Sequence, residues 1–356
     1  MAVAAKYRIL TELLRTDFLQ DGKPGKKLPT ETELMQRYHM SRQTVRRALQ
    51  QLSDEGLIQR CQGSGSYIAE PERDIPKNIA ILVSYQDDYI FPTILRDAQS
   101  VFASHGISAA VYVTGNNVAI EREILTDLIR EGISGILVEG SKTALPTPNA
   151  DLYHKLRLSG IALLFLNGIY SNLTGIPCIS DANYAGGYQL ARYLIGKGHG
   201  SIGGIFKSDD IQGPERYFGT VSALRDAGLP IRDRAFCWYD THDRSSMVDE
   251  KDARLLDRFL TERLTEVTAL VCYNDEIANL VIRRLLAMGK RVPEDMALVS
   301  FDNSYYCQVC PVGITSLAHK AERMGRIAAQ LLINILRGEA VQSASLGWTL
   351  VSRDSG

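Results

Sequence analysis

Residues 28–59 read LPTETELMQRYHMSRQTVRRALQQLSDEGLIQ, and GSGSY follows at residues 63–67. Thr30 can cap a helix, because its hydroxyl can accept a hydrogen bond from a free backbone amide. Glu33, three residues further on, can return a hydrogen bond to the amide of Thr30. This capping box predicts a helix over Glu31–Tyr38.

A second helix is predicted after a short turn. Ser41 is another capping residue, and the helix that it begins should run to about Ser53. Apolar residues recur at the i, i+3, i+4, i+7 spacing of a buried stripe: Val45, Ala48, Leu49 and Leu52. The opposite face then carries only Arg and Gln: Arg42, Gln43, Arg46, Arg47 and Gln50. Two capped helices joined by a turn predict a helix-turn-helix.

The outward face of the second helix suits the major groove of duplex DNA. Arg can bind guanine edges or phosphates in bidentate fashion, Gln can bind adenine, and the N-terminal turn of such a helix meets the base edges. Residues 57–61 and 66–69 are predicted as two short strands joined by a tip at 62–65, where glycines allow close approach to a sugar-phosphate surface. An Arg-rich helix alone could be a solvated face, but caps, stripe and tip together favour DNA binding.

On these features, residues 28–69 resemble the winged helix-turn-helix of the GntR family, in which the strand pair and its tip form the wing. The predicted DNA-binding domain covers residues 1–69. The resemblance implies contacts with DNA by Lys6, Glu31, Ser41, Arg42, Gln43, Thr44, Arg46, Arg47, Gln62, Gly63 and Ser64. The wing has no Lys or Arg between Gln62 and Tyr67, so it is not expected to contact phosphates strongly.

Composition and charge agree with a DNA-binding domain attached to a larger body. The chain has 356 residues, 45% of them hydrophobic, and a formal net charge of -1. Residues 1–77 hold 13 of the 40 Lys and Arg and 10 of the 41 Asp and Glu, which leaves 27 basic and 31 acidic residues for the rest. A basic first part and an acidic second part fit a body that does not bind DNA.

The sequence contains no pattern typical of a membrane protein, a secreted protein or a metal-binding protein. No stretch is apolar enough to cross a membrane and the N-terminus has no signal-peptide pattern, so a cytoplasmic protein without membrane contact is expected. Six scattered cysteines predict reduced thiols rather than a disulfide framework. The single CxxC at Cys307 and Cys310 is a weak metal signal, and neither a metal nor a cofactor is predicted.

The remainder of the chain predicts an α/β fold. Residues 70–77 (EPERDIPK) are polar, contain two prolines and are predicted as a linker. Short apolar runs then alternate with helix-length amphipathic segments, at residues 79–83, 109–113, 135–138, 161–166, 202–206, 268–272 and 297–301. Such runs are typical of parallel strands buried on both faces. Residues 78–356 are therefore predicted to form two doubly wound α/β subdomains.

Polar side chains follow the ends of these predicted strands. They are Asp87, Asp88, Tyr89 and Phe91 after the first strand, and Glu139, Asn167, Lys207, Asp209, Asp210, Arg216, Asn274, Asp275, Asp302 and Asn303 further on. Ligands of doubly wound folds bind at this edge. Carboxylates, Asn and Arg can bridge neighbouring hydroxyls, and aromatic faces cover the C–H faces of a sugar ring. Singly each could be a cap or turn residue, but together they predict a sugar or polyol site.

This second part resembles the effector domain of LacI-type repressors, which shares the fold of periplasmic sugar-binding proteins. The resemblance rests on GIFKSDDIQGPERYFG (204–219), VCYNDEIA (271–278), RVPEDMALVSFDNS (291–304) and TSLAHKAERMGRIAAQLL (315–332). A GntR-like domain before it is similar to the arabinose repressors of Gram-positive bacteria, as are the segments at 87–98, 135–149 and 206–213. The resemblance implies L-arabinose or a close pentose as effector. It implies effector contacts by Asp88, Tyr89, Phe91, Glu139, Lys207, Arg216, Asn274, Asp275, Asp302 and His319.

The two predicted domains together lead to the hypothesis that the chain is a sugar-responsive repressor. A homodimer formed through the large domains would bind a pseudopalindromic, double-stranded operator, and a small neutral sugar would release it. Another sugar, a purine or a sugar phosphate remains an alternative effector. An α/β enzyme acting on a sugar would use the same strand ends, but no nucleophile elbow, P-loop or metal cluster is present in the sequence, so an enzyme is not expected.

Overall fold

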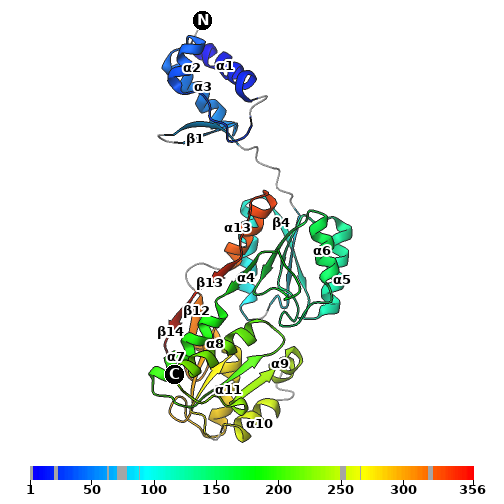
Figure 1. Cartoon of the computed structure of the whole chain (residues 1–356), viewed down its shortest axis with the longest axis vertical. Helices are drawn as coiled ribbons and strands as arrows, with labels where there is room; N and C mark the ends of the chain where they lie inside the picture. Colours follow the sequence, from blue (N-terminus) through cyan, green and yellow to red (C-terminus); the bar gives the residue numbers. More distant parts are fainter. Residues whose placement is uncertain are drawn as a thin grey trace. The chain divides into compact units, whose positions relative to one another are not determined.

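The computed structural model describes residues 3–19, 23–61, 64–69, 78–87, 89–248, 254–264, 266–319 and 324–356. The chain divides into two compact units, Met1–Asp74 and Ile75–Gly356. We call the first the head and the second the ligand unit (Figure 1). The predicted linker, residues 70–77, lies outside the described residues.

The head contains the predicted helix-turn-helix and one further helix. Its elements are α1 (Val3–Leu14), a short π-helix η1 (Arg15–Leu19), α2 (Glu31–Tyr38), α3 (Arg42–Asp54), β1 (Ile58–Cys61) and β2 (Gly65–Ile68). Both hydrogen bonds of the Thr30–Glu33 capping box are present, and the Ser41 side chain caps α3 by accepting from the amide of Thr44. The left-handed residue His39 (φ 51°) ends α2 and makes the turn between the helices.

The stripe predicted on α3 forms the core of the head. Val45, Ala48, Leu49 and Leu52 are buried, together with Leu10 and Leu14 from α1. Strands β1 and β2 pair antiparallel from Ile58–Ile68 to Cys61–Gly65, which makes the wing. Helix α1, whose apolar residues complete this core, was not predicted.

The ligand unit consists of two lobes, each built on a six-stranded sheet. The first lobe has the strand order β13-β7-β6-β5-β3-β4, with all pairs parallel. Its strands are β3 (Asn78–Val83), β4 (Ser108–Val113), β5 (Gly135–Val138), β6 (Ala162–Leu166), β7 (Cys178–Asp181) and β13 (Ala344–Leu346). Helices α4 (Phe91–Ser104) and α13 (Met324–Leu336) pack together on one side, and α5 (Val118–Glu131) and α6 (Ala150–Leu158) cover the other (Figure 1).

The second lobe has the strand order β14-β12-β11-β10-β8-β9, in which only the β12–β14 pair is antiparallel. Its strands are β8 (Ile202–Lys207), β9 (Phe236–Tyr239), β10 (Ala269–Cys272), β11 (Ala297–Phe301), β12 (Thr315–His319) and β14 (Trp348–Val351). Its helices are α7 (Asn183–Gly196), α8 (Gln212–Asp226), η2 (Asp233–Ala235), α9 (Thr241–Val248), α10 (Arg254–Glu262), α11 (Asp275–Ala287) and α12 (Tyr306–Val309).

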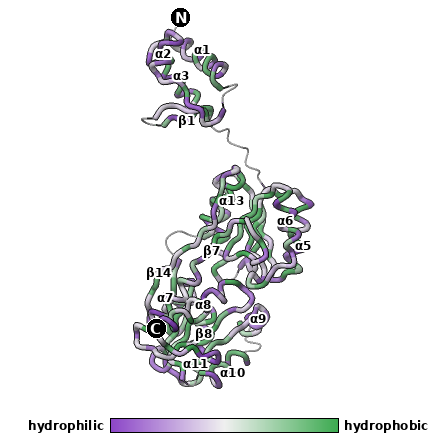
Figure 2. The backbone as a smooth tube through the Cα atoms, viewed as in Figure 1, coloured by the Kyte–Doolittle hydropathy of each residue, from purple (hydrophilic) through white to green (hydrophobic). Residues whose placement is uncertain are grey.

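All seven strands predicted for residues 78–356 are present, and the fold class is as predicted. The central strands of both sheets are buried. Hydrophobic colour predominates in the interior of the ligand unit in Figure 2. The chain passes between the lobes after β7, after β12 and between β13 and β14. The ligand unit is therefore two doubly wound lobes joined by three crossings, and the carboxyl ends of the strands are where a ligand of this fold binds.

Candidate functional site

The exposed face of α3 carries a cluster of arginines around one carboxylate. Glu31, the first residue of α2, accepts hydrogen bonds from Arg42 (3.4 Å), Arg46 (3.1 Å) and Arg60 (3.2 Å). Partial burial raises the pKa of Glu31, but hydrogen bonds from Arg46 and Arg42 outweigh burial and lower it overall. Glu31 thus holds the arginines in place, and the side chains of Arg42 and Arg46 stay 69% and 60% exposed.

Other residues predicted to contact DNA are divided between surface and core. Lys6, Ser41, Gln43 and Arg47 are exposed. The guanidinium of Arg47 lies over the ring of Tyr7. The prediction that the Thr44 side chain contacts DNA does not fit the structure, because Thr44 is only 4% exposed and its hydroxyl is 2.8 Å from that of Ser41. Its side chain packs under the helix start and has little surface to offer DNA.

The wing gains positive charge from a neighbouring segment of the chain. Lys27 forms a β-bridge with Tyr67, and its ammonium lies 5.8 Å from the centre of the Tyr67 ring. Lys26 is exposed beside it and accepts a backbone hydrogen bond from Ile68. Ser64 is exposed and its hydroxyl contacts that of Tyr67. Gln62 and Gly63 lie outside the described residues.

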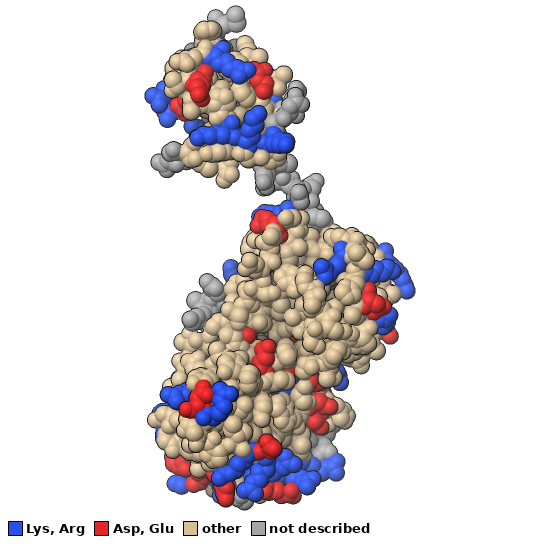
Figure 3. Space-filling model, in the orientation of Figure 1, with Lys and Arg blue, Asp and Glu red and all other residues tan. Residues whose placement is uncertain are grey.

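The wing was predicted to carry little charge, but Lys26 and Lys27, from an earlier segment of the sequence, lie beside it. Lys26, Lys27 and Arg60 were not among the predicted DNA contacts, although the run KPGKK at residues 23–27 was a visible basic signal. Lys and Arg form a band across one side of the head in Figure 3. Such a band matches the phosphate-contacting surface of a DNA-binding domain.

The ligand unit has a cavity between its lobes, at the carboxyl ends of the strands. Its interior volume is about 70 Å³, and the space between its walls is about 650 Å³ when the open solvent at its mouth is counted. The cavity is lined by hydrogen-bonding and aromatic side chains from both lobes: Ser84, Tyr85, Tyr89, Phe91, Glu139, Asn167, Asp181, Lys207, Asp210, Gln212, Arg216, Tyr239, Arg244, Tyr273, Asn274 and Asp302, with Ile90. Seven of the ten predicted effector contacts are in this set.

Backbone strain is concentrated around the cavity. Among the described residues, six of the seven non-glycine residues with positive φ lie in loops that follow strands of the ligand unit: Tyr89, Asn116, Lys142, Asn167, Asp302 and Asn303. Such conformations persist only where the surroundings enforce them, and they cluster at functional sites. The loops at the strand ends are therefore held in place rather than merely connecting elements.

Arg216 lies at the centre of the second lobe's side of the cavity. It donates hydrogen bonds to Asn183 Oδ1 (2.9 Å) and to the carbonyl of Tyr273, and its Nη2 lies 3.5 Å from Asp302 Oδ1. The guanidinium is also 4.2 Å from the centre of the Phe301 ring. Helices α7 and α8 can place it there because they touch through glycines; a Cβ at Gly187 would lie 2.0 Å from the Arg216 carbonyl oxygen.

Tyr89 connects the first lobe to Asp302, the ionic partner of Arg216. Its hydroxyl donates to Asp302 Oδ2 (2.7 Å) and accepts from the amide of Asp275 (3.3 Å). Arg216 and Tyr89 together hold the Asp302 carboxylate at the cavity wall, where it can still accept hydrogen bonds from a ligand hydroxyl.

On the first lobe, Glu139 is the buried carboxylate that faces the cavity. It accepts hydrogen bonds from the Ser84 amide (2.7 Å) and from Asn167 Nδ2 (2.8 Å). Burial raises the pKa of Glu139 to about 7, even though the hydrogen bonds from Ser84 and Asn167 act in the opposite direction. Opposite it, Lys207 forms ion pairs with Asp209 and Asp210, whose charges raise its pKa against the effect of burial.

Two predicted effector contacts do not line the cavity. Asp275 begins α11 and is fully buried, where its carboxylate accepts hydrogen bonds from the Ser304 amide and from the hydroxyls of Ser300 and Ser316. Its role is to fix the loop after β11. Asn274 lines the cavity and also caps α11, as the alternative reading of it held.

His319 is the second predicted effector contact that does not line the cavity. It ends β12, where the chain leaves the second lobe, and its Nδ1 lies 3.1 Å from Asp181 Oδ1. Its ring is 4.8 Å from that of Trp348, which begins β14. These residues sit at all three crossings between the lobes, so His319 belongs to the hinge and only its partner Asp181 reaches the cavity. The predicted contact Asp88 lies outside the described residues.

Several residues that line the cavity were not predicted from the sequence, because no local motif distinguishes them from core or surface residues. Tyr85 lines the cavity with a buried hydroxyl that has no hydrogen-bond partner. Arg244 reaches it from α9, forms a bidentate ion pair with Glu276 at 2.7 Å and lies over the Tyr85 ring. Tyr239 ends β9, Tyr273 directly follows β10, and from the sequence both would be assigned to the core. Only their place at a strand end could have indicated a ligand contact.

Metal binding and membrane insertion find no support in the described residues. No group of three or more His, Cys, Asp or Glu there could hold a metal ion. Cys307 and Cys310 are both buried and unpaired by disulfides. None of the described helices is long and apolar enough to span a membrane.

Comparison with known proteins identifies both parts of the chain. Residues 6–68 match the bacterial regulatory proteins of the gntR family, and residues 191–355 match the periplasmic binding protein-like domain. The arabinose metabolism transcriptional repressor of Halalkalibacterium halodurans is 33% identical over 94% of this chain and 88% of its own length. The repressor of the same name from Geobacillus stearothermophilus is 34% identical over 90% and 87%.

A solved structure supports the fold of the ligand unit. The periplasmic binding protein/LacI transcriptional regulator from Alkaliphilus metalliredigens, complexed with D-xylulofuranose, is similar with a TM-score of 0.65 and 22% identity. The match covers 78% of this chain and 98% of that one. The two relatives above are transcriptional repressors and not enzymes. The chain therefore belongs to the family of transcriptional repressors that includes the arabinose metabolism repressors, with a gntR-family DNA-binding domain followed by a periplasmic binding protein-like domain.

Proposed function

We propose that this repressor binds operator DNA as a homodimer and is released from it by L-arabinose or a closely related pentose. The observation that carries the proposal is the cavity between the lobes, which polar and aromatic side chains line and in which each described cation has a carboxylate partner. Two repressors of arabinose metabolism share a third of its sequence. A neighbour of the same fold is complexed with a sugar, D-xylulofuranose.

The pairing of charges favours a neutral ligand. Each cation among the described lining residues has a carboxylate partner: Lys207 with Asp209 and Asp210, Arg216 with Asp302, and Arg244 with Glu276. A sugar phosphate needs unpaired cations or a glycine-rich helix start to balance its charge. Carboxylates such as Glu139 and Asp302, in contrast, accept hydrogen bonds from sugar hydroxyls, and the ring of Phe91 can cover a C–H face.

The proposed residue roles follow from the two sites. Arg42, Gln43, Arg46 and Arg47 on α3 would contact the major groove, with Lys6, Lys26 and Lys27 near the phosphates. Tyr89, Glu139, Arg216, Asn274 and Asp302 would bind the sugar. A dimer would place two α3 helices on a pseudopalindrome. The sugar releases DNA only if it binds the two forms of the dimer with different affinity.

A thermal-shift panel on the full chain tests the effector. The panel contains L-arabinose, D-arabinose, D-xylose, D-ribose, D-galactose, a sugar phosphate and a purine. A ligand at 100 times its dissociation constant stabilises by about 2.7 kcal/mol, which is a readily measured shift of the unfolding temperature. We expect L-arabinose to give the largest shift. A larger shift with the sugar phosphate or the purine would refute the proposed effector, and light scattering of the same samples tests the dimer.

A further inference from the structure

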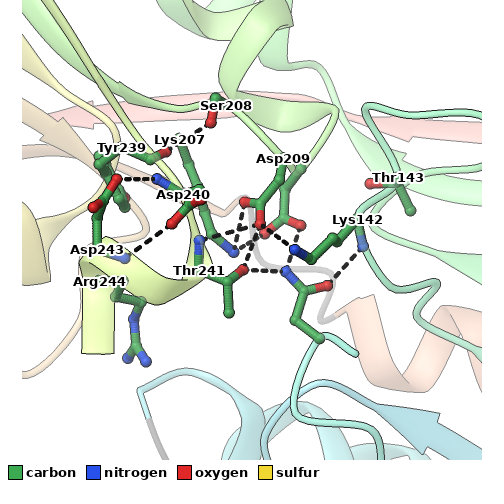
Figure 4. Close-up of polar contacts among 12 residues, drawn as sticks. Lys142, Thr143, Lys207, Ser208, Asp209, Tyr239, Asp240, Thr241, Asp243 and Arg244 are labelled. Carbon is green, nitrogen blue, oxygen red and sulfur yellow. Dashed lines mark hydrogen bonds and ion pairs between the residues drawn. The ribbon is translucent and has the colours of Figure 1, made fainter. Parts of the chain in front are cut away.

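The two lobes are joined by a set of polar contacts at one side of the cavity. From the first lobe come Asn116, Lys142, Thr143 and Ala144, and from the second Asp209, Asp210, Ile211 and Thr241. We call this set the latch. Figure 4 shows Lys142 and Thr143 facing Asp209 and Thr241 across the boundary between the lobes.

Asn116 makes the shortest side-chain contacts of the latch. Its amide nitrogen donates to Thr241 Oγ1 (2.6 Å) and to Asp210 Oδ1 (3.0 Å), both on the second lobe. Its carbonyl oxygen accepts from the amide of Lys142 (2.7 Å) on its own lobe. The residue is 1% exposed, and its backbone is left-handed (φ 55°), a conformation that Asn and Asp tolerate. All of its side-chain hydrogen-bonding capacity toward the second lobe is used.

Asp210 connects the latch to the cavity. It lines the cavity, its Oδ2 forms an ion pair with Lys207, and its Oδ1 accepts from Asn116. Asn116 itself is not among the lining residues. We propose that Asn116 is a positioning residue for sugar binding, which acts by holding Asp210 and Thr241 against the first lobe when the cleft is closed. This inference rests on the proposed function.

The latch can act only in the closed form. If the lobes separate about their three crossings, the bonds from Asn116 to the second lobe break, whereas its bond to Lys142 within the first lobe is kept. A contact that exists in one of two conformations shifts the equilibrium between them. Removing the cross-lobe bonds therefore weakens sugar binding and leaves the sugar-free protein as stable as before.

The variant Asn116→Asp isolates this effect. Asp keeps the oxygen that accepts from Lys142 and tolerates the left-handed backbone, but it turns the cross-lobe donor into a carboxylate that faces Asp210. We expect the dissociation constant for the sugar to rise by about tenfold or more, the effect of losing a buried hydrogen bond to a charged group. The unfolding temperature without sugar and the sugar-free affinity for DNA should not change.

Thr241→Val tests the same bonds from the opposite lobe. Val has nearly the shape of Thr but cannot accept from Asn116. It also loses the hydrogen bond from the Thr241 hydroxyl to Asp209 within the second lobe, which the double variant takes into account. We expect a rise of the dissociation constant in the same direction, and a double variant that is less impaired than the sum of the two single changes predicts. Strict additivity of the two effects would show that the residues do not act through their mutual contact.

Asn117→Ala is the matched control. Asn117 is the neighbouring residue and caps α5 by accepting from the amides of Ala119 and Ile120. Its side chain makes no hydrogen bond to the described residues of the second lobe. This variant should lower the unfolding temperature equally with and without sugar, leaving the sugar-induced shift intact. If Asn116→Asp behaved in this way, Asn116 would be a folding residue and the inference would be wrong.

The experiment separates this inference from the proposed effector. The response of the wild type to L-arabinose decides the effector. The inference is decided by comparing wild type and Asn116→Asp with whichever monosaccharide of the panel gives the largest shift. Equal dissociation constants for the two proteins would overturn the role of Asn116 even if L-arabinose is the effector.

Discussion

The head and the ligand unit place their charges in opposite ways. On α3 the side chains of Arg42 and Arg46 are more than half exposed, whereas Arg216 and Asp302 beside the cavity are each 4% exposed. Exposed arginines attract a polyanion over a distance and can be replaced without loss of the fold. Buried ions cost free energy unless each is paired, so a change there affects stability and recognition together.

The largest expected effect is the replacement of Arg216. Arg216→Ala leaves Asp302 buried without its ionic partner, and breaking such a pair costs about 3–5 kcal/mol of unfolding free energy. Chemical denaturation of the ligand unit in the full chain measures this loss. The control is Arg225→Ala on the same helix, where an exposed pair with Asp226 should contribute less than about 1 kcal/mol. Equal losses from both variants would contradict the comparison.

The second expected effect is a pH dependence caused by Glu139. Its pKa is about 7 in the folded protein, against an ordinary value of 4.5. Between these values the unfolded chain releases a proton that the folded protein retains, so stability falls as pH rises from about 4.5 to about 7. The change is on the order of 3 kcal/mol. Thermal unfolding from pH 4.5 to 8 measures it, and Glu139→Gln should flatten this part of the profile.

A sugar would couple to the same proton. If sugar hydroxyls donate to Glu139, they favour its ionised form, and L-arabinose should bind more tightly above pH 7 than at pH 5.5. Titration calorimetry in two buffers of different ionisation enthalpy should show proton release at pH 6. No proton release there would mean that the sugar does not contact Glu139.

The third effect concerns recognition by the head. Arg46→Ala should weaken operator binding by about 1–3 kcal/mol, the contribution of a good arginine–base contact. It should change neither sugar binding nor the stability of the ligand unit. Fluorescence anisotropy with a duplex selected by the protein from a random pool measures the loss. Arg37→Ala, exposed on α2 with a partner in Asp17, is the control that should bind DNA almost normally.

The smallest effect is expected from Lys27 beside the wing. A phosphate contact lacks sequence information, so Lys27→Ala should weaken specific and non-specific duplexes by the same factor. The slope of log affinity against log salt concentration should become less steep by about 1. A loss confined to the selected duplex would instead assign Lys27 to base recognition.

The sequence predicted the local motifs well and the long-range contacts poorly. The capping box at Thr30, the cap at Ser41 and the stripe on α3 depend on residues within a few positions of one another, and all were found. Arg60 lies beside Glu31 and Lys27 lies beside the wing because of strand pairing, which local patterns do not encode. Thr44 was expected to contact DNA because of the family resemblance, but it lies four residues before Ala48 on the buried face of α3.

The cavity shows the same limit. Rules about strand ends identified Glu139, Arg216 and Asp302 because polar residues there stand out against apolar strands. They could not distinguish Asp302 from Asp275, since the partners of Asp275 come from two other strand ends, at Ser300 and Ser316. The contacts of His319 with Asp181 and Trp348 depend on the return of the chain between lobes, which only the structure reveals.

The central claim is that a sugar bound between the lobes governs the binding of DNA by the head. The most direct measurement is the anisotropy of the selected duplex bound by the whole chain, titrated with L-arabinose at fixed salt, for wild type and Glu139→Gln. We expect L-arabinose to release DNA from the wild type, and to release it from Glu139→Gln only at higher sugar concentration. DNA that stays bound to the wild type at saturating L-arabinose, shown by the thermal shift, would contradict it.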